Sequence, residues 1–518
     1  MESLIIEPLS IVFRSIGTIL TSPIYYFYMC VGAFIGILFG AIPGLTGTTA
    51  VIMLLPLTIF LPINLSLVFL LSIFKGGMFG GAISAILLGI PGSPGAVATV
   101  IDGYPLGQKG QGLKAIKMAL FSSMQGDSMW TLFAILSAPF VAKLIMYISS
   151  PEIFLIIFAC LLLVGFLTTS YYKETSLASI AKAIISGAAG LMITIVGVEP
   201  IFGTNRFSFG TYQLQAGMDL IPVFLGLFGI AMVLEILVGE VNIKNLQKIQ
   251  VPKPKQLSDT KVSWKEYRFC QKVICFGSFI GATIGLIPGI GCNAAGLISH
   301  GMGRHVAKDK NNYGKGSLEG VAICESANSA VYGTNLLPLV TLGIPGSAEA
   351  AVLIAAFLIQ GVPVGPLLIN HEPGLIYGMF GGMLIADLFV LFIGIVAMHI
   401  FIKAVSLPRN ILFPVITILL FIGTYAGSQW FFHFWVVIAF GILGYFMNKF
   451  GFSTSSLCIG FVLGRYAEMN FNHTIIILHG DILKVFFRPA FIILLVTMIM
   501  VGIIIKIIGR KRKISRRI

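Results

Sequence analysis

Charged side chains are scarce in this chain: Asp, Glu, Lys and Arg together make up 10% of its 518 residues. Soluble domains carry roughly 25% charged residues. Apolar residues make up 57% of the chain and the mean hydropathy is +0.97. A soluble protein of this size could not hide so much apolar surface. The scarcity of charge therefore excludes an ordinary soluble protein and indicates an integral membrane protein.

Paired cysteines and clustered histidines are also missing. The seven cysteines are scattered and no CxxC occurs, which excludes a disulfide framework and zinc-site spacing. We expect these thiols to be buried and unreactive. The seven histidines form no Ser/His or metal-ligand pattern, so we expect neither an enzyme nor a bound cofactor. His300 and His305 flank a short piece of a basic loop and are expected to be solvated.

Long apolar runs are abundant and do not alternate in polarity, as the run from Ile153 to Leu167 illustrates. Apolar stretches of about 20 residues cross a bilayer as helices, whereas membrane barrels need alternating polarity. About ten to twelve stretches fit the helical pattern, some of them interrupted by Pro and Gly. The sequence therefore predicts an all-α polytopic membrane protein with broken or re-entrant helices.

Positive charge exceeds negative charge by 14, and its location explains it. Of the 34 Lys and Arg residues, 22 lie in four stretches: residues 109–117, 244–272, 304–315 and 506–518. Basic loops beside membrane helices stay in the cytoplasm. Topology and contact with anionic lipid therefore explain this positive charge, and no nucleic-acid partner is expected. We predict an N-terminal half (1–240), a cytoplasmic linker (241–272), a C-terminal half (273–505) and a cytoplasmic tail (506–518).

Two Pro-Gly motifs occur in each half, in the same order. "GILFGAIPGLTGTTA" (Gly36–Ala50) corresponds to "GATIGLIPGIGCNAAG" (Gly281–Gly296), and "LGIPGS" occurs at Leu88–Ser93 and Leu342–Ser347. The prolines of the two pairs are 245 and 254 residues apart. Matched motifs in order, at nearly constant spacing, predict an internal repeat.

The loops around these motifs carry opposite charge in the two halves. Between the paired motifs, the first half has the neutral "TIFLPINLS" and the second has the basic "HGMGRHVAKDKNNYGKG". After the second motif the pattern reverses, since the first half continues into "GQKGQGLKAIK" and no Lys or Arg occurs from Gly316 to Ile402. Basic loops mark the cytoplasmic side, so this pattern predicts two inverted-topology repeats.

Broken helices of this kind can bind anions. Proline lacks a backbone donor, and broken backbone persists at membrane depth only where it is buried or lines a wet cavity. A half-helix that starts after Pro-Gly directs free N–H groups and a positive dipole end into that cavity. The candidate substrate-binding residues at these tips are Pro43, Gly44, Thr46, Thr48, Pro91, Gly92, Ser93, Pro288, Gly289, Asn293, Pro345, Gly346 and Ser347. Simple kinks or turns are the alternative interpretation.

The glycines of the second motif offer a test of the tips. We expect a bulky residue at Gly92 or Gly346 to abolish uptake and to leave the fold intact.

Ionisable side chains inside the apolar segments are few, so each is a functional candidate. Lys75 could meet a substrate carboxylate, replace a coupling cation, or extend to the membrane interface.

Glu325, Asn328 and Ser329 stand at i, i+3 and i+4 and so share a helix face. This face favours coordination of a coupling cation or hydrogen bonding to substrate over simple bonding between helices. Asp102 fits better as the cap of a turn.

Several long motifs resemble the large membrane subunit of the tripartite tricarboxylate transporters, the TctA family. They include "IPGLTGTTA", "GGAISAILLGIPGSPGAVATVIDGYPLGQKG" and "EGVAICESANSAVYGTNLLPLVTLGIPGS", and the similarity runs from Tyr28 to Ile493. The resemblance implies sodium-coupled uptake of carboxylates across the bacterial or archaeal inner membrane. It also implies an elevator-like transporter with inverted repeats, a small four-helix membrane subunit and a periplasmic binding protein that delivers the substrate.

The chain departs from the family pattern at three positions: Lys75 replaces a usual aromatic residue, Ser329 a second Asn, and Glu199 an Asp. The first two leave the coupling ion and the carboxylate open. We predict a secondary active transporter that imports di- or tricarboxylates by alternating access and is coupled to a sodium or proton gradient. A homodimer is compatible with this prediction. An anion channel that uses the same helix tips is the alternative.

Overall fold

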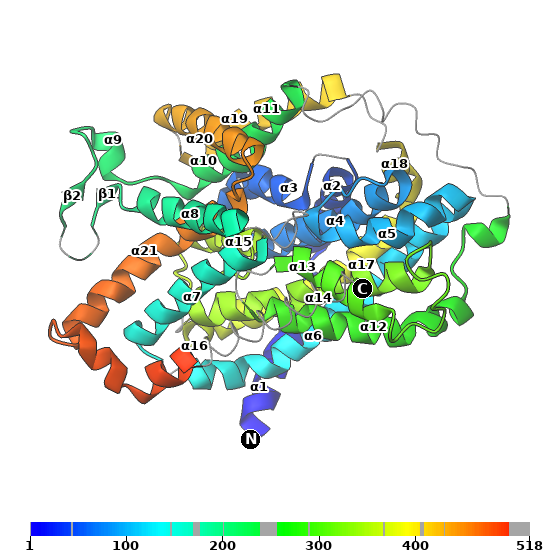
Figure 1. The fold of residues 1–518 in the computed structure, drawn as a ribbon, viewed down its shortest axis with the longest axis horizontal. Helices are drawn as coiled ribbons and strands as arrows, with labels where there is room; N and C mark the ends of the chain where they lie inside the picture. Colours follow the sequence, from blue (N-terminus) through cyan, green and yellow to red (C-terminus); the bar gives the residue numbers. More distant parts are fainter. Residues whose placement is uncertain are drawn as a thin grey trace.

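The computed structural model describes residues 2–42, 45–145, 148–168, 177–199, 201, 203–238, 256–287, 291–365, 368–404, 409–428 and 430–496. This part of the chain is almost entirely helical, which confirms the all-α class, and its two short strands pair in one antiparallel hairpin. Figure 1 shows this hairpin and α9 together at one edge of the molecule. Short 3-10 or π segments are labelled η.

The first half contains α1 (Glu2–Thr21), α2 (Pro23–Ala41), α3 (Gly47–Leu54), η1 (Leu55–Phe60), α4 (Ile63–Leu88), η2 (Pro94–Ala96), α5 (Val97–Leu106), η3 (Gly107–Gln111) and α6 (Gly112–Ile145). It continues with α7 (Ser150–Thr168), α8 (Leu177–Thr194), β1 (Gly197–Val198), β2 (Asn205–Arg206), α9 (Tyr212–Gln215), α10 (Leu220–Phe224), η4 (Leu225–Ile230) and α11 (Ala231–Leu237).

The second half begins with η5 (Leu257–Asp259), α12 (Trp264–Gly285), α13 (Gly291–Gly303), α14 (Leu318–Leu342), α15 (Ala348–Ile359) and α16 (Leu368–His371). It ends with α17 (Pro373–Val396), α18 (Met398–Ala404), α19 (Arg409–Ser428), α20 (Phe432–Lys449), α21 (Thr454–Ile477) and η6 (Ile482–Phe487). Residues 241–255 of the predicted linker and the whole predicted tail lie outside the described residues.

Four helices of the described residues are long and apolar enough to cross a membrane: α2, α4, α17 and α20. Others are long but more polar, such as α6 with 34 residues and α14 with 25. At about 1.5 Å per residue these two helices measure about 50 and 37 Å, which is enough to span a bilayer. A multi-pass membrane protein is therefore supported, and the total of ten to twelve spans stays a prediction.

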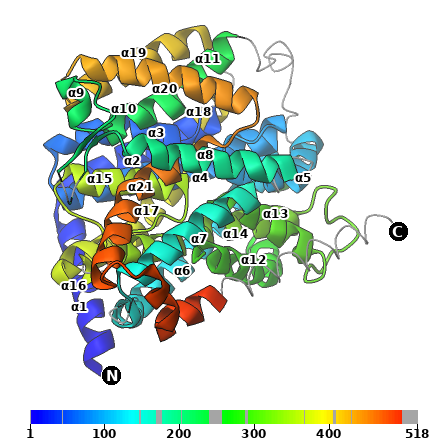
Figure 2. The ribbon, with the colours of Figure 1, turned by 60° about the vertical axis from the view of Figure 1, so that its left-hand side comes forward.

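Two helices, α4 and α14, form the centre of the molecule. They are buried on all sides, over Leu65–Leu87 and Glu319–Thr341. A helix surrounded by protein has no polar outer face, which explains why neither segment shows an amphipathic stripe. Helices α2 and α17 pack on α4, and α12 and α6 pack on α14. Figures 1 and 2 show α6, α12 and α14 side by side in both views.

Glycines allow the same close approach in the two central helix pairs. A Cβ added to Gly36 of α2 would lie 2.0 Å from the carbonyl oxygen of Ile73 in α4. A Cβ added to Gly281 of α12 would lie 2.0 Å from the carbonyl oxygen of Ala327 in α14. Gly281 and Ala327 follow Gly36 and Ile73 by 245 and 254 residues, the same offsets that separate the paired motifs. Equivalent sequence positions thus make equivalent contacts.

Both central helices also end in the same way. Gly89 follows α4 with φ 70° and Gly343 follows α14 with φ 72°. This left-handed conformation closes a helix C-terminus and suits glycine, which has no Cβ to clash. Because the two helix ends share this geometry, the two "LGIPGS" motifs form matching breaks after α4 and α14.

Three of the basic stretches meet at one end of the molecule. Lys109 donates to the carbonyl oxygen of Lys315 (3.1 Å), and Lys117 donates to that of Thr260 (2.8 Å). We call residues 104–117, 256–272 and 304–317 the basic end. Their contact agrees with the prediction that these loops share one side of the membrane.

The two neutral connections also meet. Gln360 donates to the carbonyl oxygens of Thr58 (2.5 Å) and Leu61 (3.2 Å), and we call residues 58–66 and 360–365 the Gln360 end. Helix α4 starts at the Gln360 end and finishes against Gly107 of the basic end. Helix α14 starts at the basic end and finishes where Gly343 faces Val364. The two helices therefore run in opposite directions.

Candidate functional site

The first described break separates α4 from α5. The Gly92 amide donates to the carbonyl oxygen of Gly81 (3.3 Å). A Cβ on Gly92 would lie 2.1 Å from the carbonyl oxygen of Gly40, which belongs to the backbone of α2. The expectation that a bulky residue at Gly92 leaves the fold intact is therefore wrong, because the backbone of α2 leaves no room for any side chain.

Unpaired polar groups surround the N-terminus of α5. Ser93 Oγ and both polar atoms of the Asn328 amide are buried, and none has a hydrogen-bond partner among the described residues. Asn328 reaches this tip directly, since a Cβ added to Gly95 would lie 2.2 Å from its Oδ1. The N-cap residue Ala96 provides no side-chain cap. This tip therefore offers free donors beside a positive helix end.

The second break, before α15, is partly satisfied by its own side chains. Ser347 caps the helix by accepting from the Ala350 amide (3.2 Å), and it also accepts from Asn335 Nδ2 (3.0 Å). Asn335 Oδ1 is buried without a partner among the described residues. A Cβ on Gly346 would lie 2.0 Å from that oxygen. A substitution at Gly346 would therefore meet a side chain, whereas one at Gly92 would meet backbone.

The N-terminus of α15 faces that of α3. Thr46 caps α3 by accepting from the Thr49 amide (3.2 Å), and Thr48 donates to Glu349 Oε1 (3.0 Å). Glu349 stands in the first turn of α15, where a carboxylate is favoured by the helix dipole. The sequence analysis missed Glu349, although an acid two residues after "IPGS" was a visible signal. The protein's own carboxylate thus occupies this tip.

Four predicted tip residues, Pro43, Gly44, Pro288 and Gly289, lie outside the described residues. The side chain of Asn293 does so too. Pro91 and Pro345 lie at the two breaks, the first half-buried and the second buried. The substrate-binding role of these residues stays a prediction.

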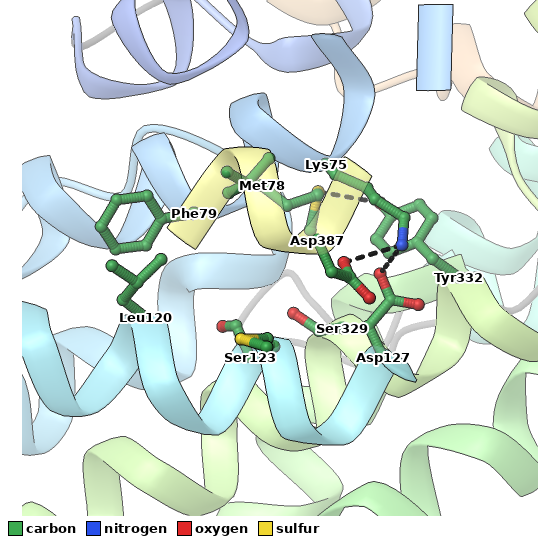
Figure 3. Close-up of a pocket in the computed structure, with 11 residues that line it drawn as sticks. Lys75, Met78, Phe79, Leu120, Ser123, Asp127, Ser329, Tyr332 and Asp387 are labelled. Carbon is green, nitrogen blue, oxygen red and sulfur yellow. Dashed lines mark hydrogen bonds and ion pairs between the residues drawn. The ribbon is translucent and has the colours of Figure 1, made fainter. Parts of the chain in front are cut away.

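Lys75 forms a buried ionic cluster with two acids that the sequence analysis missed. Its Nζ lies 2.8 Å from Asp127 Oδ2 on α6 and 2.7 Å from Asp387 Oδ1 on α17. Figure 3 shows the three side chains converging from three helices. The Lys75 side chain is 3% exposed, so extension to the membrane interface does not fit. Asp387 stands in an otherwise apolar segment, and that was the available signal; Asp127 stands among Ser and Gln residues and gave a weaker one.

The hydrogen bonds of this cluster are nearly complete. Besides the two acids, Lys75 Nζ donates to the carbonyl oxygen of Met383 (2.8 Å), which uses all three of its protons. Thr131 donates to Asp127 Oδ1 (3.1 Å) and Ser128 to Asp387 Oδ2 (2.6 Å). With its protons engaged in this way, Lys75 has none left for a substrate carboxylate in this conformation.

A cavity of about 20 Å³ adjoins the cluster, and Ser123, Ser329 and Tyr332 help to line it. This volume holds about one water molecule. It is too small for a carboxylate of several carbons. The cavity therefore suits a water molecule or a small ion.

The predicted polar face of α14 is present, but its members meet different partners. Glu325 accepts hydrogen bonds from Thr99 and from Ser123, the latter at 3.2 Å. Asn328 faces the tip of α5, and Ser329 faces the cavity beside Lys75. Ser123 lines the same cavity, so one hydroxyl separates Glu325 from the ionic cluster. A coupling-ion role for this face stays a prediction.

Asp102 holds the basic loop to α5. Its carboxylate accepts from the amides of Gly314 (2.9 Å), Gly316 (2.9 Å) and Ser317 (2.8 Å), and it meets His300 Nε2 at 2.8 Å. The prediction that Asp102 caps a turn is thus confirmed, although the turn lies more than 200 residues away. His300 stacks on Tyr313, whose pKa burial raises. The expectation that His300 is solvated is wrong, because Asp102 and Tyr313 enclose it.

A family model described as "Tripartite tricarboxylate transporter TctA family" matches residues 26–459. The chain belongs to the TctA family. This confirms the resemblance drawn from the motifs and points to a component of a tricarboxylate transporter. It points away from an enzyme. The TctA family takes its description from tripartite systems, in which a membrane protein of this kind works with a binding protein and a small membrane subunit.

Two proteins of Agrobacterium vitis are similar to the chain. An uncharacterized 52.8 kDa protein in the TAR-I ttuC' 3' region is 31% identical over 461 residues, covering 89% of each chain. An uncharacterized protein in the TAR-II ttuC' 3' region is 35% identical over 201 residues, covering 39% of this chain and 83% of the relative. No solved structure matches the chain. Among the described residues, no group of three or more His, Cys, Asp or Glu is placed to hold a metal ion.

Proposed function

We propose that the chain is the large membrane subunit of a secondary active transporter that imports small di- or tricarboxylates by alternating access. Membership of the TctA family supports the substrate class, and the many apolar helices support a multi-pass membrane protein. Two further features of the structure support a transport cycle, namely the tip of α5 and the arrangement of the two halves.

The unpaired polar groups at the tip of α5 carry the proposal. A buried polar atom without a partner costs about 1–3 kcal/mol, so Ser93 and Asn328 are expected to bind something that enters from solvent. The Ser93 hydroxyl and the Asn328 amide group are free hydrogen-bond donors, and the adjacent N-terminus of α5 carries a positive partial charge. Carboxylate oxygens are the matching acceptors. In the proposal, one carboxylate of the substrate binds here, and Asn335 accepts from a hydroxyl elsewhere on it.

The arrangement of the halves supports inverted repeats. Matched glycine contacts and matched helix ends occur at constant offsets, and α4 and α14 run in opposite directions between the basic end and the Gln360 end. Inverted repeats place a binding site at their interface and open it to each side in turn. We propose an elevator-like cycle on this basis, with the basic end, the linker and the C-terminal tail in the cytoplasm.

The remaining assignments follow from the family. We propose that a periplasmic binding protein delivers the carboxylate to the Gln360 end, and that a small four-helix subunit binds in the inner membrane. The proposal includes assembly of the chain as a homodimer. A sodium or proton gradient drives accumulation.

The test is uptake of radiolabelled citrate and succinate into proteoliposomes that contain the full chain. We expect accumulation against a gradient that collapses without an ion gradient, and loss of uptake in Ser93→Ala and Asn328→Ala. Ser186→Ala is the matched control, because among the described residues this buried hydroxyl donates within α8, to the carbonyl oxygen of Lys182 (2.7 Å). Downhill flux alone would support a channel, and wild-type uptake in both site variants would refute the site.

A further inference from the structure

Lys75 of the ionic cluster and the nearby Ser329 stand at corresponding positions of the two halves. Ser329 follows Lys75 by 254 residues, the offset of the paired motifs, and each stands halfway along its central helix. Asp127 and Asp387 stand near the middle of α6 and α17, the helices that flank α14 and α4. The cluster therefore lies at the centre of the molecule, where the two halves meet.

The charges of this cluster do not balance. Two carboxylates face one ammonium, and both acids are about 95% buried. Burying a net charge in a membrane protein is costly, so a cluster with a charge of −1 favours the uptake of one more positive charge. The carboxylate oxygens already accept from Lys75, Ser128 and Thr131. What they lack is a single compensating cation.

A second observation shows where the cation can enter. Ser329 is 6% exposed and lines the water-sized cavity beside the two acids. No hydrogen bond joins its hydroxyl to another described residue. The hydroxyl faces a cavity that holds about one water molecule, so it can bind water there. In the view of Figure 3, Ser329 lies between Ser123 and Asp127.

We propose that the Asp127–Lys75–Asp387 cluster is the coupling site of the transporter and takes up one proton in each cycle, with Lys75 in the place of a metal cation. This inference rests on the proposed function. A proton leaves a hydronium ion in the cavity water and adds to a carboxylate oxygen of the acid pair, which changes the cluster charge from −1 to 0. The pair releases it to water on the other side of the membrane.

Sodium fits the cluster poorly. Hard cations prefer several oxygen ligands, and here the ammonium already lies between the two carboxylates, 2.8 and 2.7 Å from them. A sodium ion at this position would be repelled by the positive charge of the Lys75 ammonium. A proton needs only one oxygen lone pair. The same argument predicts that removing the ammonium opens the site to sodium.

The other groups that face the cluster leave the charge count unchanged. From α14 it meets the neutral phenol of Tyr332 and the hydroxyl of Ser329, and from α6 the hydroxyls of Ser123 and Ser128. Glu325 is the nearest further carboxyl group, separated from the cavity by Ser123. In the proposal, Glu325 exchanges the proton with the cavity through the Ser123 hydroxyl.

The test uses a series of variants that differ in cluster charge. Citrate uptake into proteoliposomes with the full chain is driven by an inward proton gradient or by an inward sodium gradient. We expect proton-driven, sodium-independent uptake in the wild type and in Lys75→Arg, which keeps the charge. Asp387→Asn leaves one ammonium with one carboxylate, so proton-driven accumulation is expected to fall at least tenfold, with citrate exchange retained.

A double variant controls for misfolding. Lys75→Met leaves two unpaired carboxylates and can fail to fold, but Lys75→Met/Asp387→Asn restores the wild-type charge of −1. We expect this variant to regain accumulation and to gain stimulation by sodium, because the ammonium is gone. Sodium-driven uptake in the wild type, or unchanged proton coupling in Asp387→Asn, would overturn the proposal.

Infrared spectroscopy separates this inference from the proposed function. Without any substrate, pH-difference spectra of the purified wild type are expected to include the C=O stretch of a protonated carboxyl group that belongs to the acid pair. The band disappears in Asp387→Asn and persists in Asp481→Asn, a matched change at an exposed acid. Absence of the band in the wild type would refute the proton site even if citrate is transported. Presence of the band without citrate binding would refute the substrate assignment and leave the proton site standing.

Discussion

Lys75 Nζ and Asp387 Oδ1 lie 2.7 Å apart in the interior, although 312 residues separate them in the sequence. Breaking a buried ion pair on one side leaves an uncompensated charge and costs about 3–5 kcal/mol. We expect Lys75→Met to lower the free energy of unfolding by about this amount, and Asp387→Asn by less, because Lys75 then still pairs with Asp127.

The double variant completes this cycle. Lys75→Met/Asp387→Asn should be more stable than Lys75→Met, since it removes one of the two orphaned charges. Thermal unfolding of the purified chain in detergent measures all three. Equal losses in both single variants, with simple additivity in the double variant, would show that the two residues do not stabilise each other.

Close helix packing gives a second prediction. A Cβ on Gly281 would lie 2.0 Å from backbone in α14, whereas one on Gly374 meets nothing within 4 Å. Overpacking of this kind costs roughly 1–3 kcal/mol. We therefore expect Gly281→Ala to lower Tm clearly and Gly374→Ala to leave it nearly unchanged. Similar Tm values for the two variants would contradict the observed packing.

The motifs predicted much of this architecture. The two "LGIPGS" motifs located both described helix breaks. The predicted grouping of basic and neutral loops agrees with two separate ends of the molecule. These features are local or repeated, so a single sequence displays them.

Contacts between distant segments were not predictable in the same way. Nothing near Lys75 in the sequence indicates that two acids from α6 and α17 surround it, and nothing near His300 indicates Asp102, which lies 198 residues away. The crowding of Gly92 by the backbone of α2 is also a tertiary property. Such pairings require the packed helices themselves.

The basic loop gives a third prediction. Asp102 Oδ1 accepts from three backbone amides of residues 314–317, and Oδ2 meets His300 Nε2. An asparagine removes the negative charge that strengthens the three amide bonds and places an NH2 group, which cannot accept, opposite His300. We expect Asp102→Asn to release this loop and to speed tryptic cleavage after Lys308, Lys310 or Lys315. Asp259→Asn is the control, since its acid meets Gln111 elsewhere at the basic end. Equal cleavage rates would show that Asp102 does not hold the loop.

The two ends of the molecule give a fourth prediction. Asn311 and Pro363 are exposed, at the basic end and at the Gln360 end respectively. In a cysteine-free background, Asn311→Cys should react with an impermeant maleimide only from the cytoplasmic side. Pro363→Cys should react only from the opposite side. Labelling of both positions from one side would contradict the proposed topology.

The anion site at the tip of α5 is the central claim, and a thermal-shift titration of the purified full-length chain tests it most directly. Tricarboxylates and dicarboxylates are titrated against the wild type and a Ser93→Ala/Asn328→Ala double variant, with Ser186→Ala as the control. We expect at least one carboxylate to raise the Tm of the wild type and of the control, and to leave that of the double variant unchanged. Equal stabilisation of all three proteins, or of none, would contradict the assigned site.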